Sequence, residues 1–384
     1  MQVTRLVLKN WRNFKAFDAR FQDVSYLLGP NASGKSNLLD VFRFLRDISK
    51  PKGGGLQSAV DDRGGIVKVR CLHARNDTEV LIDVRLSDDG DEGEESWRYV
   101  LGFKPEGKGA QRILVSREEV WEGEQRIINR PDDDDARDRA LLTQTRLEQI
   151  AANARFRKLA EFFGNITYLH LVPQLLKFSE QIGGNRLEND PFGQGFLDRI
   201  ARTSEKTRDA RLRKIGEALS LAVPHFRDLR FVRDEVGRPH LEAMYQHHRP
   251  KAGWQTEEQF SDGALRLIGI LWSLLEGSSM LLMEEPEISL NNEVVRQIPV
   301  IIDRLQRGRK QKRQVVISTH SEAMLDNKGI DGRGVILLVP ESEGSGARGL
   351  TDDELQMLVD GLSVAETILP MTRPQRVEQL GLWK

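Results

Sequence analysis

The sequence predicts an α/β fold in which a mixed sheet is combined with an antiparallel β subdomain and a helical lobe. After residue 260, apolar strand patterns alternate with helical patterns, which is typical of a mainly parallel sheet. Between residues 66 and 130 the apolar residues recur with a period of two, which favours antiparallel strands. Residues 177–225 are polar with a helical pattern, which predicts a helical insert in the lobe.

The expected elements follow one another along the chain. Strands are expected at 3–9 and 23–28, followed by a helix over 37–48. Antiparallel strands are expected at 66–74, 79–87, 96–104, 112–123 and 124–130, before a helix over 137–163 and a strand at 166–172. A hairpin at 226–246 precedes helix 262–276, strand 280–283, helix 291–306, strand 314–318, a short helix and strand 334–339. The acidic runs 88–95 and 132–135 predict solvent-exposed turns.

The composition fits a globular protein with a sizeable core. The 384 residues are 39% hydrophobic and 30% charged, enough for two or three domains or for one core with a large insertion. The net charge of -1 neither favours nor excludes nucleic-acid binding, so any basic surface must be local. Cys71 is the only cysteine, which excludes an intrachain disulfide and indicates a cytoplasmic location. We expect no signal peptide and no membrane partner, because no apolar run approaches the roughly 18 residues that span a bilayer.

Residues 29–36, GPNASGKS, match the phosphate-loop pattern GxxxxGK[ST] between an expected strand and an expected helix. In such a loop the backbone N–H groups close around a phosphate, Lys35 reaches the β- and γ-phosphate oxygens, and the Ser36 hydroxyl holds Mg²⁺. The sequence therefore predicts a nucleoside triphosphate site. Its candidate binding residues are Gly29, Asn31, Ala32, Ser33, Gly34, Lys35, Ser36 and Asn37.

Two further patterns place polar groups after apolar strands. In MLLMEEPEISL, residues 280–290, two carboxylates follow a strand as in a Walker B motif. Glu284 is expected near Mg²⁺, and Glu285 is expected to polarise the attacking water. In QVVISTHSE, His320 follows the next strand and could sense or stabilise the γ-phosphate, although a structural histidine is the alternative.

Residues 261–263, Ser-Asp-Gly, open an apolar helical run. A turn of this kind bares N–H groups at the positive end of a helix and can bind an anion. Serine and aspartate are also favoured as ordinary helix caps, so both interpretations stay open.

Taken in order, these motifs resemble those of ATP-binding-cassette (ABC) ATPases, in the branch that contains RecF, SMC proteins and the overcoming-lysogenization-defect (OLD) nucleases. The resemblance covers 1–50 and 255–340 well, and GKSNLLD and EEPE favour this branch over transporter ATPases. It implies ATP as the nucleotide and a homodimer or an assembly of dimers, in which Ser261 and Gly263 contact the γ-phosphate of ATP held by a second copy.

The resemblance implies further site residues. Arg12 and Asn13 correspond to a nucleotide-contacting loop, and residues 289–292 to the D-loop, which contacts the opposite subunit. Gln174 fits the position of the Q-loop glutamine near the metal, with Gln57 as a rival. Asp262 and Glu284 depart from the usual Gly and Asp of the family, so we expect weaker closure and slow hydrolysis of ATP to ADP and phosphate.

The predicted organisation has four segments. Residues 1–172 form the N-terminal part of the nucleotide-binding lobe, 173–278 the helical lobe with the signature turn, and 279–350 the C-terminal part of the nucleotide-binding lobe. Residues 351–384 form a tail that either docks a partner or caps the core. The basic run 199–214 has two possible explanations, which are contact with DNA and a solvated helix face. The basic patch 307–313 is expected to be a charged loop. The candidate DNA-contacting cations are Arg199, Arg202, Lys206, Arg208, Arg211, Arg213 and Lys214.

The functional expectation combines these features. After His320, 64 residues remain, too few for the Toprim nuclease domain of OLD nucleases, and there is no coiled-coil arm. The resemblance then implies an ATPase that acts as the sensor or regulatory subunit of a bacterial antiphage defence module with a separately encoded nuclease or toxin. The alternatives are a DNA-binding recombination or repair ATPase like RecF and, with less support, the nucleotide-binding subunit of a transporter.

Overall fold

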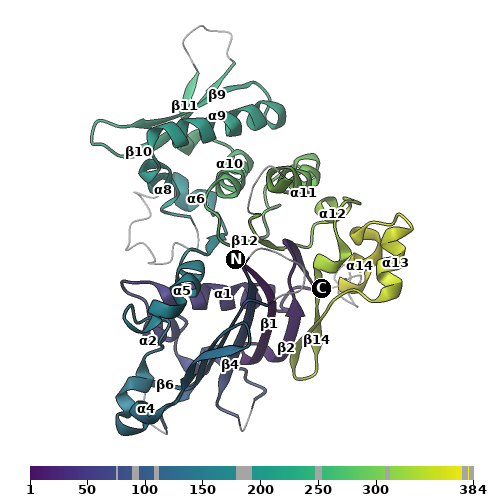
Figure 1. The fold of residues 1–384 in the computed structure, drawn as a ribbon. Coiled ribbons are helices and arrows are strands. Elements are labelled where there is room, and N and C mark those ends of the chain that lie inside the picture. Colours follow the sequence, from purple (N-terminus) through teal and green to yellow (C-terminus); the bar gives the residue numbers. More distant parts are fainter. Residues whose placement is uncertain are drawn as a thin grey trace. The chain divides into compact units, whose positions relative to one another are not determined.

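The computed structural model describes residues 1–74, 77–88, 95–107, 112–178, 193–246, 253–307, 312–373 and 379. The chain divides into two compact units (Figure 1). Unit 1 comprises Met1–Thr167, Ser278–Leu282 and Arg309–Lys384, and unit 2 comprises Tyr168–Gly277 and Met283–Gly308. The first predicted boundary lies at 172, five residues beyond the end of the first stretch of unit 1, and residues 283–308 group with unit 2.

One sheet of unit 1 is fully antiparallel, which confirms the expected β subdomain. Its strand order is β2-β1-β4-β5-β6-β7. The strands are β1 Gln2–Trp11, β2 Phe14–Arg20, β4 Val80–Ser87, β5 Trp97–Pro105, β6 Ile113–Glu122 and β7 Gln125–Arg130. The strand expected at 66–74 is wrong, because Ile66–Val69 form the short helix α3. A short apolar run fits either structure, and here Val69 is buried while Val67 is exposed.

A second sheet has the order β15-β14-β3-β13-β12-β8. Strand β3 (Val24–Leu28) pairs in parallel with both β13 (Val315–Ser318) and β14 (Val335–Glu341), which confirms the expected parallel core. Strand β15 (Gly344–Arg348) returns antiparallel to β14. At β12 (Leu281–Glu284) and β8 (Thr167–Leu169) the chain passes between unit 1 and unit 2.

Helix α1 (Lys35–Ser49) is buried on most of its surface and joins the phosphate loop to the core. The Phe44 ring lies 5.1 Å from Trp11 of β1 and 5.4 Å from Phe103 of β5 between ring centroids. Such aromatic pairs add to the stabilisation from burial. The other helices of unit 1 are α2 Leu56–Asp61, α4 Asp133–Arg137, α5 Arg157–Gly164, α12 Glu322–Leu325, α13 Asp352–Val359 and α14 Val364–Thr372, with short 3₁₀ turns at Arg139–Thr143, Ala152–Phe156 and Gly332–Gly334.

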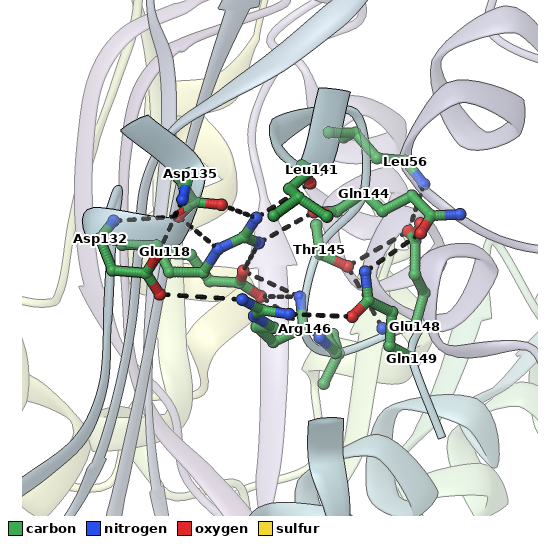
Figure 2. Close-up of polar contacts among 12 residues, drawn as sticks. Leu56, Glu118, Asp132, Asp135, Leu141, Gln144, Thr145, Arg146, Glu148 and Gln149 are labelled. Carbon is green, nitrogen blue, oxygen red and sulfur yellow. Dashed lines mark hydrogen bonds and ion pairs between the residues drawn. The ribbon is translucent and has the colours of Figure 1, made fainter. Parts of the chain in front are cut away.

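The helix expected over 137–163 is wrong, because short turns and α5 replace it. The buried Glu118 carboxylate of β6 accepts hydrogen bonds from the backbone N–H groups of Arg146 and Leu147, at 2.8 and 3.3 Å (Figure 2). These N–H groups cannot then donate within a helix. A contact with a strand far away in the sequence thus overrides the local helical pattern.

The acidic run 132–135 is exposed at its first three residues, as expected, but it begins helix α4 instead of forming a turn, and its last residue, Asp135, is buried. Asp132 caps α4, and Asp135 is buried and bonded to the Arg130 guanidinium at 2.7 and 2.9 Å. The same guanidinium donates to Glu118 at 2.9 Å, so that one buried cation serves two buried carboxylates. Most of the other acidic run, 88–95, lies outside the described residues.

Unit 2 contains the expected hairpin and helices. Its antiparallel sheet has the order β11-β10-β9, from β9 Phe226–Arg233, β10 Pro239–Tyr245 and β11 Trp254–Thr256. Its helices are α6 Pro173–Lys177, α8 Phe196–Arg202, α9 Glu205–Ala222, α10 Asp262–Leu275 and α11 Asn292–Arg307, and Glu257–Gln259 form a 3₁₀ turn. Helix α10 is buried from Ala264 to Leu274. Across the described ranges of the chain, no helix has the length and apolar character needed to cross a membrane.

We expect Arg130→Met to lower the free energy of unfolding by about 3 to 5 kcal/mol, because Glu118 and Asp135 would stay buried without their cation. The control is Arg137→Met, since the Arg137–Asp134 pair is exposed, with 78% and 68% of the side-chain surfaces accessible. Exposed pairs contribute at most about 1 kcal/mol. Chemical denaturation measures both variants, and equal small losses would contradict the role of the buried cation.

Burial raises the pKa of Glu148 to about 7, although it accepts hydrogen bonds from the Leu56 N–H and the Thr145 hydroxyl (Figure 2). The folded state therefore keeps a proton that the unfolded chain releases above a pKa of about 4.5. The protein consequently loses the stability that this proton contributes as the pH rises from about 4.5 through about 7, where the folded-state carboxyl also ionises. Glu148→Gln keeps an acceptor for Leu56 and removes the titration. We expect the variant to gain stability relative to wild type between pH 5 and pH 8 in denaturation curves. A constant difference would contradict the raised pKa.

Candidate functional site

The phosphate loop lies between β3 and α1 and contains backbone conformations that favour glycine. The backbone φ angles are 151° at Gly29, 64° at Ala32 and 102° at Gly34. A side chain at Gly29 would place its Cβ 2.6 Å from the Ser33 hydroxyl, and one at Gly34 would lie 2.3 Å from the Asn13 amide nitrogen. Both glycines are therefore required by conformation and by space.

The loop has the polar groups that a bound phosphate needs. Lys35 Nζ donates to the carbonyls of Gly29 and Pro30, at 2.9 and 3.2 Å, so its charge lies over the loop. The Ser33 hydroxyl is buried and has no hydrogen-bond partner among the described residues. The first turn of α1 contains no acidic residue that would repel a phosphate at the positive end of the helix. The residues present thus fit a bound phosphate.

The turn between β1 and β2 lies against the phosphate loop and α1. The Trp11 indole N–H donates to the Asn37 carbonyl at 2.8 Å, and the Asn13 amide donates to the Ser33 carbonyl at 2.9 Å. Arg12 has a φ of 49° and bonds Asp40 through Nε and Nη2, at 3.0 and 2.6 Å. The predicted nucleotide-contacting residues Arg12 and Asn13 therefore contact the loop and its helix directly.

Asp40 anchors Arg12 and was not anticipated from the sequence. It lies one helical turn after Ser36 and also accepts from Arg63 at 2.9 and 3.0 Å. Burial alone would raise the pKa of Asp40, but the charges of Arg63, Arg12 and Arg43 outweigh it and lower the pKa. Asp40 therefore stays ionised. An acid on the buried side of α1 was the available sequence signal, but its partner Arg63 is distant in sequence.

His320 lies at the same sheet edge as the phosphate loop. Ser318 of β13 is in register with Leu27 of β3, and the Thr319 N–H donates to the Leu27 carbonyl at 3.3 Å. The strands are parallel, so the residues that follow them emerge at one edge. His320 is exposed there, and its predicted role toward the γ-phosphate stays a prediction.

The Walker B carboxylates belong to unit 2. Glu284 ends β12, and its carboxylate accepts a hydrogen bond from the Tyr168 hydroxyl of β8. Glu285 has a φ of 43°, a strained conformation for a residue with a side chain. Tyr168 was not anticipated, because nothing in its local pattern distinguishes it from a core tyrosine.

The predicted signature turn and the predicted D-loop lie against each other within one chain. Ser261 caps α10, and its hydroxyl accepts from the Ala264 N–H at 3.2 Å. A Cβ at Gly263 would lie 2.6 Å from the Ser289 carbonyl, so a larger residue does not fit. Ser261 therefore acts as an ordinary helix cap in this structure. A cap of this kind is compatible with contact to ATP held by a second copy of the chain.

The unusual Asp262 of the signature turn is neutralised. Its carboxylate accepts from Lys177 Nζ at 2.7 Å and from the Gln174 amide at 2.6 Å, both on α6. The positive charge of Lys177 offsets a carboxylate that would otherwise weaken anion binding at this helix end. Gln174, the predicted Q-loop residue, here bonds the signature turn, and Lys177 was missed.

The rival Q-loop residue, Gln57, has a structural position. Its amide nitrogen donates to the carbonyls of Ile113 and Thr143, at 2.8 and 2.7 Å. Its amide oxygen accepts from the Ile113 N–H at 3.0 Å. This amide links α2 to the antiparallel sheet.

The predicted DNA-contacting cations separate into two sets. Three lie over aromatic rings: Arg199 over Phe196, Arg208 over Phe231 and Arg211 over Trp272. Four are exposed: Arg202, Lys206, Arg213 and Lys214. Most of the basic patch 307–313 lies outside the described residues, but Arg313 is buried and donates to the Ser279 carbonyl at 2.6 Å.

The fold is that of SMC head domains. The chain is similar to the SMC head bound to the C-winged helix domain of ScpA, with a TM-score of 0.53 at 16% identity, over 92% of this chain and 99% of that chain. It is also similar to the Smc head with an extended coiled coil bound to the C-terminal domain of ScpA derived from Pyrococcus furiosus. Here the TM-score is 0.50 at 14% identity, over 94% of this chain and 98% of that chain. No curated protein matches the chain.

A family model spans the predicted motifs. It is described as "AAA domain, putative AbiEii toxin, Type IV TA system" and matches residues 24–326. This range contains the phosphate loop, the signature turn, the Walker B strand and His320. Together with the fold, the match identifies a P-loop ATPase of ABC or AAA type. The chain belongs to the family of AAA domains that carries this AbiEii-like description.

Proposed function

We propose that the protein is an ABC-type ATPase of the RecF/SMC/OLD-like branch that hydrolyses ATP slowly. The observation that carries the proposal is the phosphate loop, whose glycines, Lys35 and buried Ser33 hydroxyl form a cradle for a triphosphate. Lys35 exchanges its loop carbonyls for β- and γ-phosphate oxygens, and Arg12 adds charge beside α1. Mg²⁺, when bound at Ser36, neutralises charge that develops on the phosphates.

The Walker B residues divide the hydrolytic work. Glu285 accepts a proton from the attacking water, and His320 contacts the γ-phosphate from the end of β13. Glu284 would lie near a bound Mg²⁺, but the Tyr168 hydroxyl already donates to its carboxylate. The Glu284 side chain is longer than the usual aspartate, and its carboxylate is already engaged by Tyr168. Both features support slow hydrolysis of ATP.

The active form in this proposal is a dimer around two ATP molecules. Ser261 and Gly263 of one chain complete the triphosphate site of its twin, and residues 289–292 contact the twin as well. Two observations support this. Gly263 packs on the Ser289 carbonyl, so both segments form one surface, and Lys177 neutralises Asp262. Phosphate charge would hold the dimer closed and hydrolysis would loosen it.

The wider role in this proposal is antiphage defence, in which the ATPase controls a separately encoded effector. The family description names a toxin and a toxin–antitoxin system. The matched SMC heads are bound to ScpA domains. Both favour a chain that works with a partner protein, and the proposal places this role in the cytoplasm.

The second candidate function is DNA binding in recombination or repair, as in RecF. The exposed cations Arg202, Lys206, Arg213 and Lys214 favour it. Arg211 lies over the Trp272 ring, so Arg213 is the better position for charge reversal. Binding to gapped or forked duplex DNA that Arg213→Glu abolishes would support this candidate.

We expect Glu285→Gln to bind ATP and to accumulate as a closed dimer, because the water loses its general base while Lys35 still binds phosphate. Lys35→Ala is the matched control and should neither bind ATP nor dimerise. Size-exclusion chromatography at saturating MgATP measures both variants. A monomeric Glu285→Gln variant with bound ATP would contradict the dimer scheme.

We expect the protein to co-purify with the product of an adjacent gene when the native operon is expressed. A nuclease or toxin in the complex supports the defence role, and a recombination protein supports the alternative. A chain that captures no neighbour-encoded protein, and hydrolyses no ATP with or without DNA, would rule out the regulatory role.

A further inference from the structure

The Asn13 side chain uses its hydrogen bonds on the protein itself. Its amide nitrogen donates to the Ser33 carbonyl at 2.9 Å and to the Ser345 hydroxyl at 2.9 Å. Its amide oxygen accepts from the Asn37 side chain at 2.8 Å. A side-chain amide has only two N–H groups, so the side chain of Asn13 has no N–H left for a nucleotide in this structure.

The Asn13–Ser33 bond fixes the orientation of one peptide plane. The peptide between Ser33 and Gly34 is trans, and in a trans peptide the C=O and the N–H point in opposite directions. The Ser33 carbonyl points to Asn13, so the Gly34 N–H points to the side away from Asn13. The amide of Asn13 also fills the space where a side chain of Gly34 would lie. Gly34 is the N-cap of α1. Backbone N–H groups at the N-terminus of a helix bind anions such as phosphate.

We propose that Asn13 is a positioning residue that turns the Gly34 N–H toward the phosphate, and that Asn37 and Ser345 hold Asn13 in place. This inference rests on the proposed ATP-binding function. It assigns Asn13 to the support of the phosphate loop instead of to direct nucleotide contact.

Strand β15 makes this support rigid. The Ser345 N–H donates to the Asn13 carbonyl at 2.9 Å, so Ser345 bonds both the backbone and the side chain of Asn13. Gly344 has a φ of 119°, and a Cβ there would lie 2.3 Å from the same carbonyl. The C-terminal hairpin of β14 and β15 thus packs directly on the turn that holds the phosphate loop.

The test is Asn13→Asp, which keeps the shape but replaces the N–H donors with a carboxylate that faces the Ser33 carbonyl. Asn10→Asp is the matched control. Asn10 has the same kind of positive φ, 59°, and its amide donates to the Glu79 carbonyl at 2.8 Å, outside the phosphate loop. Calorimetry measures MgATP affinity, and denaturation without nucleotide measures stability.

We expect Asn13→Asp to weaken MgATP binding at least about tenfold, because the Gly34 N–H is no longer held toward the phosphate. Asn10→Asp should bind like wild type at a similar loss of stability. In steady-state hydrolysis the KM for ATP should rise while kcat stays within about threefold, because ground-state binding is lost. Ser345→Ala should weaken binding by a smaller factor at unchanged stability.

MgATP affinity of Asn13→Asp within twofold of wild type would overturn the inference. Should Asn13→Asp fail to fold, Ser345→Ala decides: weaker binding at unchanged stability supports the inference, and unchanged binding overturns it. Wild-type protein that does not bind MgATP would overturn the proposed function itself. This failure is distinct, because it appears before any variant is compared.

Discussion

The phosphate loop must keep its N–H groups directed inward, and much of unit 1 is arranged around that constraint. Gly29 and Gly34 have positive φ angles and no room for a Cβ. The loop alone cannot enforce this backbone, so the turn at residues 11–13 holds it from outside. Because α1 is buried against aromatic residues of both β1 and β5, the loop is fixed at the end where it enters this helix.

In unit 2, close packing and an ion pair shape the predicted signature turn. Gly263 leaves space for the Ser289 carbonyl, so the turn and the D-loop share one surface. Asp262 introduces a negative charge at a helix end suited to anions, and Lys177 offsets it. In the proposed dimer this arrangement permits closure around ATP despite the unusual residue. Asp262, which replaces the usual glycine of the family, is thus accompanied by a nearby cation, Lys177.

Local patterns predicted the parts of the fold that depend on local structure. The phosphate loop, β3, β13 and α10 were expected because their motifs or periodicities are continuous. The break in the helix over 137–163 could not be predicted, since it depends on Glu118 of a distant strand. Asp40, Tyr168 and Lys177 were missed for the same reason, because each acts through a partner remote in sequence. Asp135 shows that an acidic run can contain a buried ion pair.

A structure with MgATP bound tests the central claim most directly. The account predicts that the ammonium of Lys35 moves from the Gly29 and Pro30 carbonyls to the phosphates, while the Asn13–Ser33 hydrogen bond persists and Gly34 donates to an oxygen of ATP. It also predicts residues 261–263 of a second chain at the γ-phosphate. ATP found away from residues 29–36, or a signature turn remote from every nucleotide in the assembly, would contradict it.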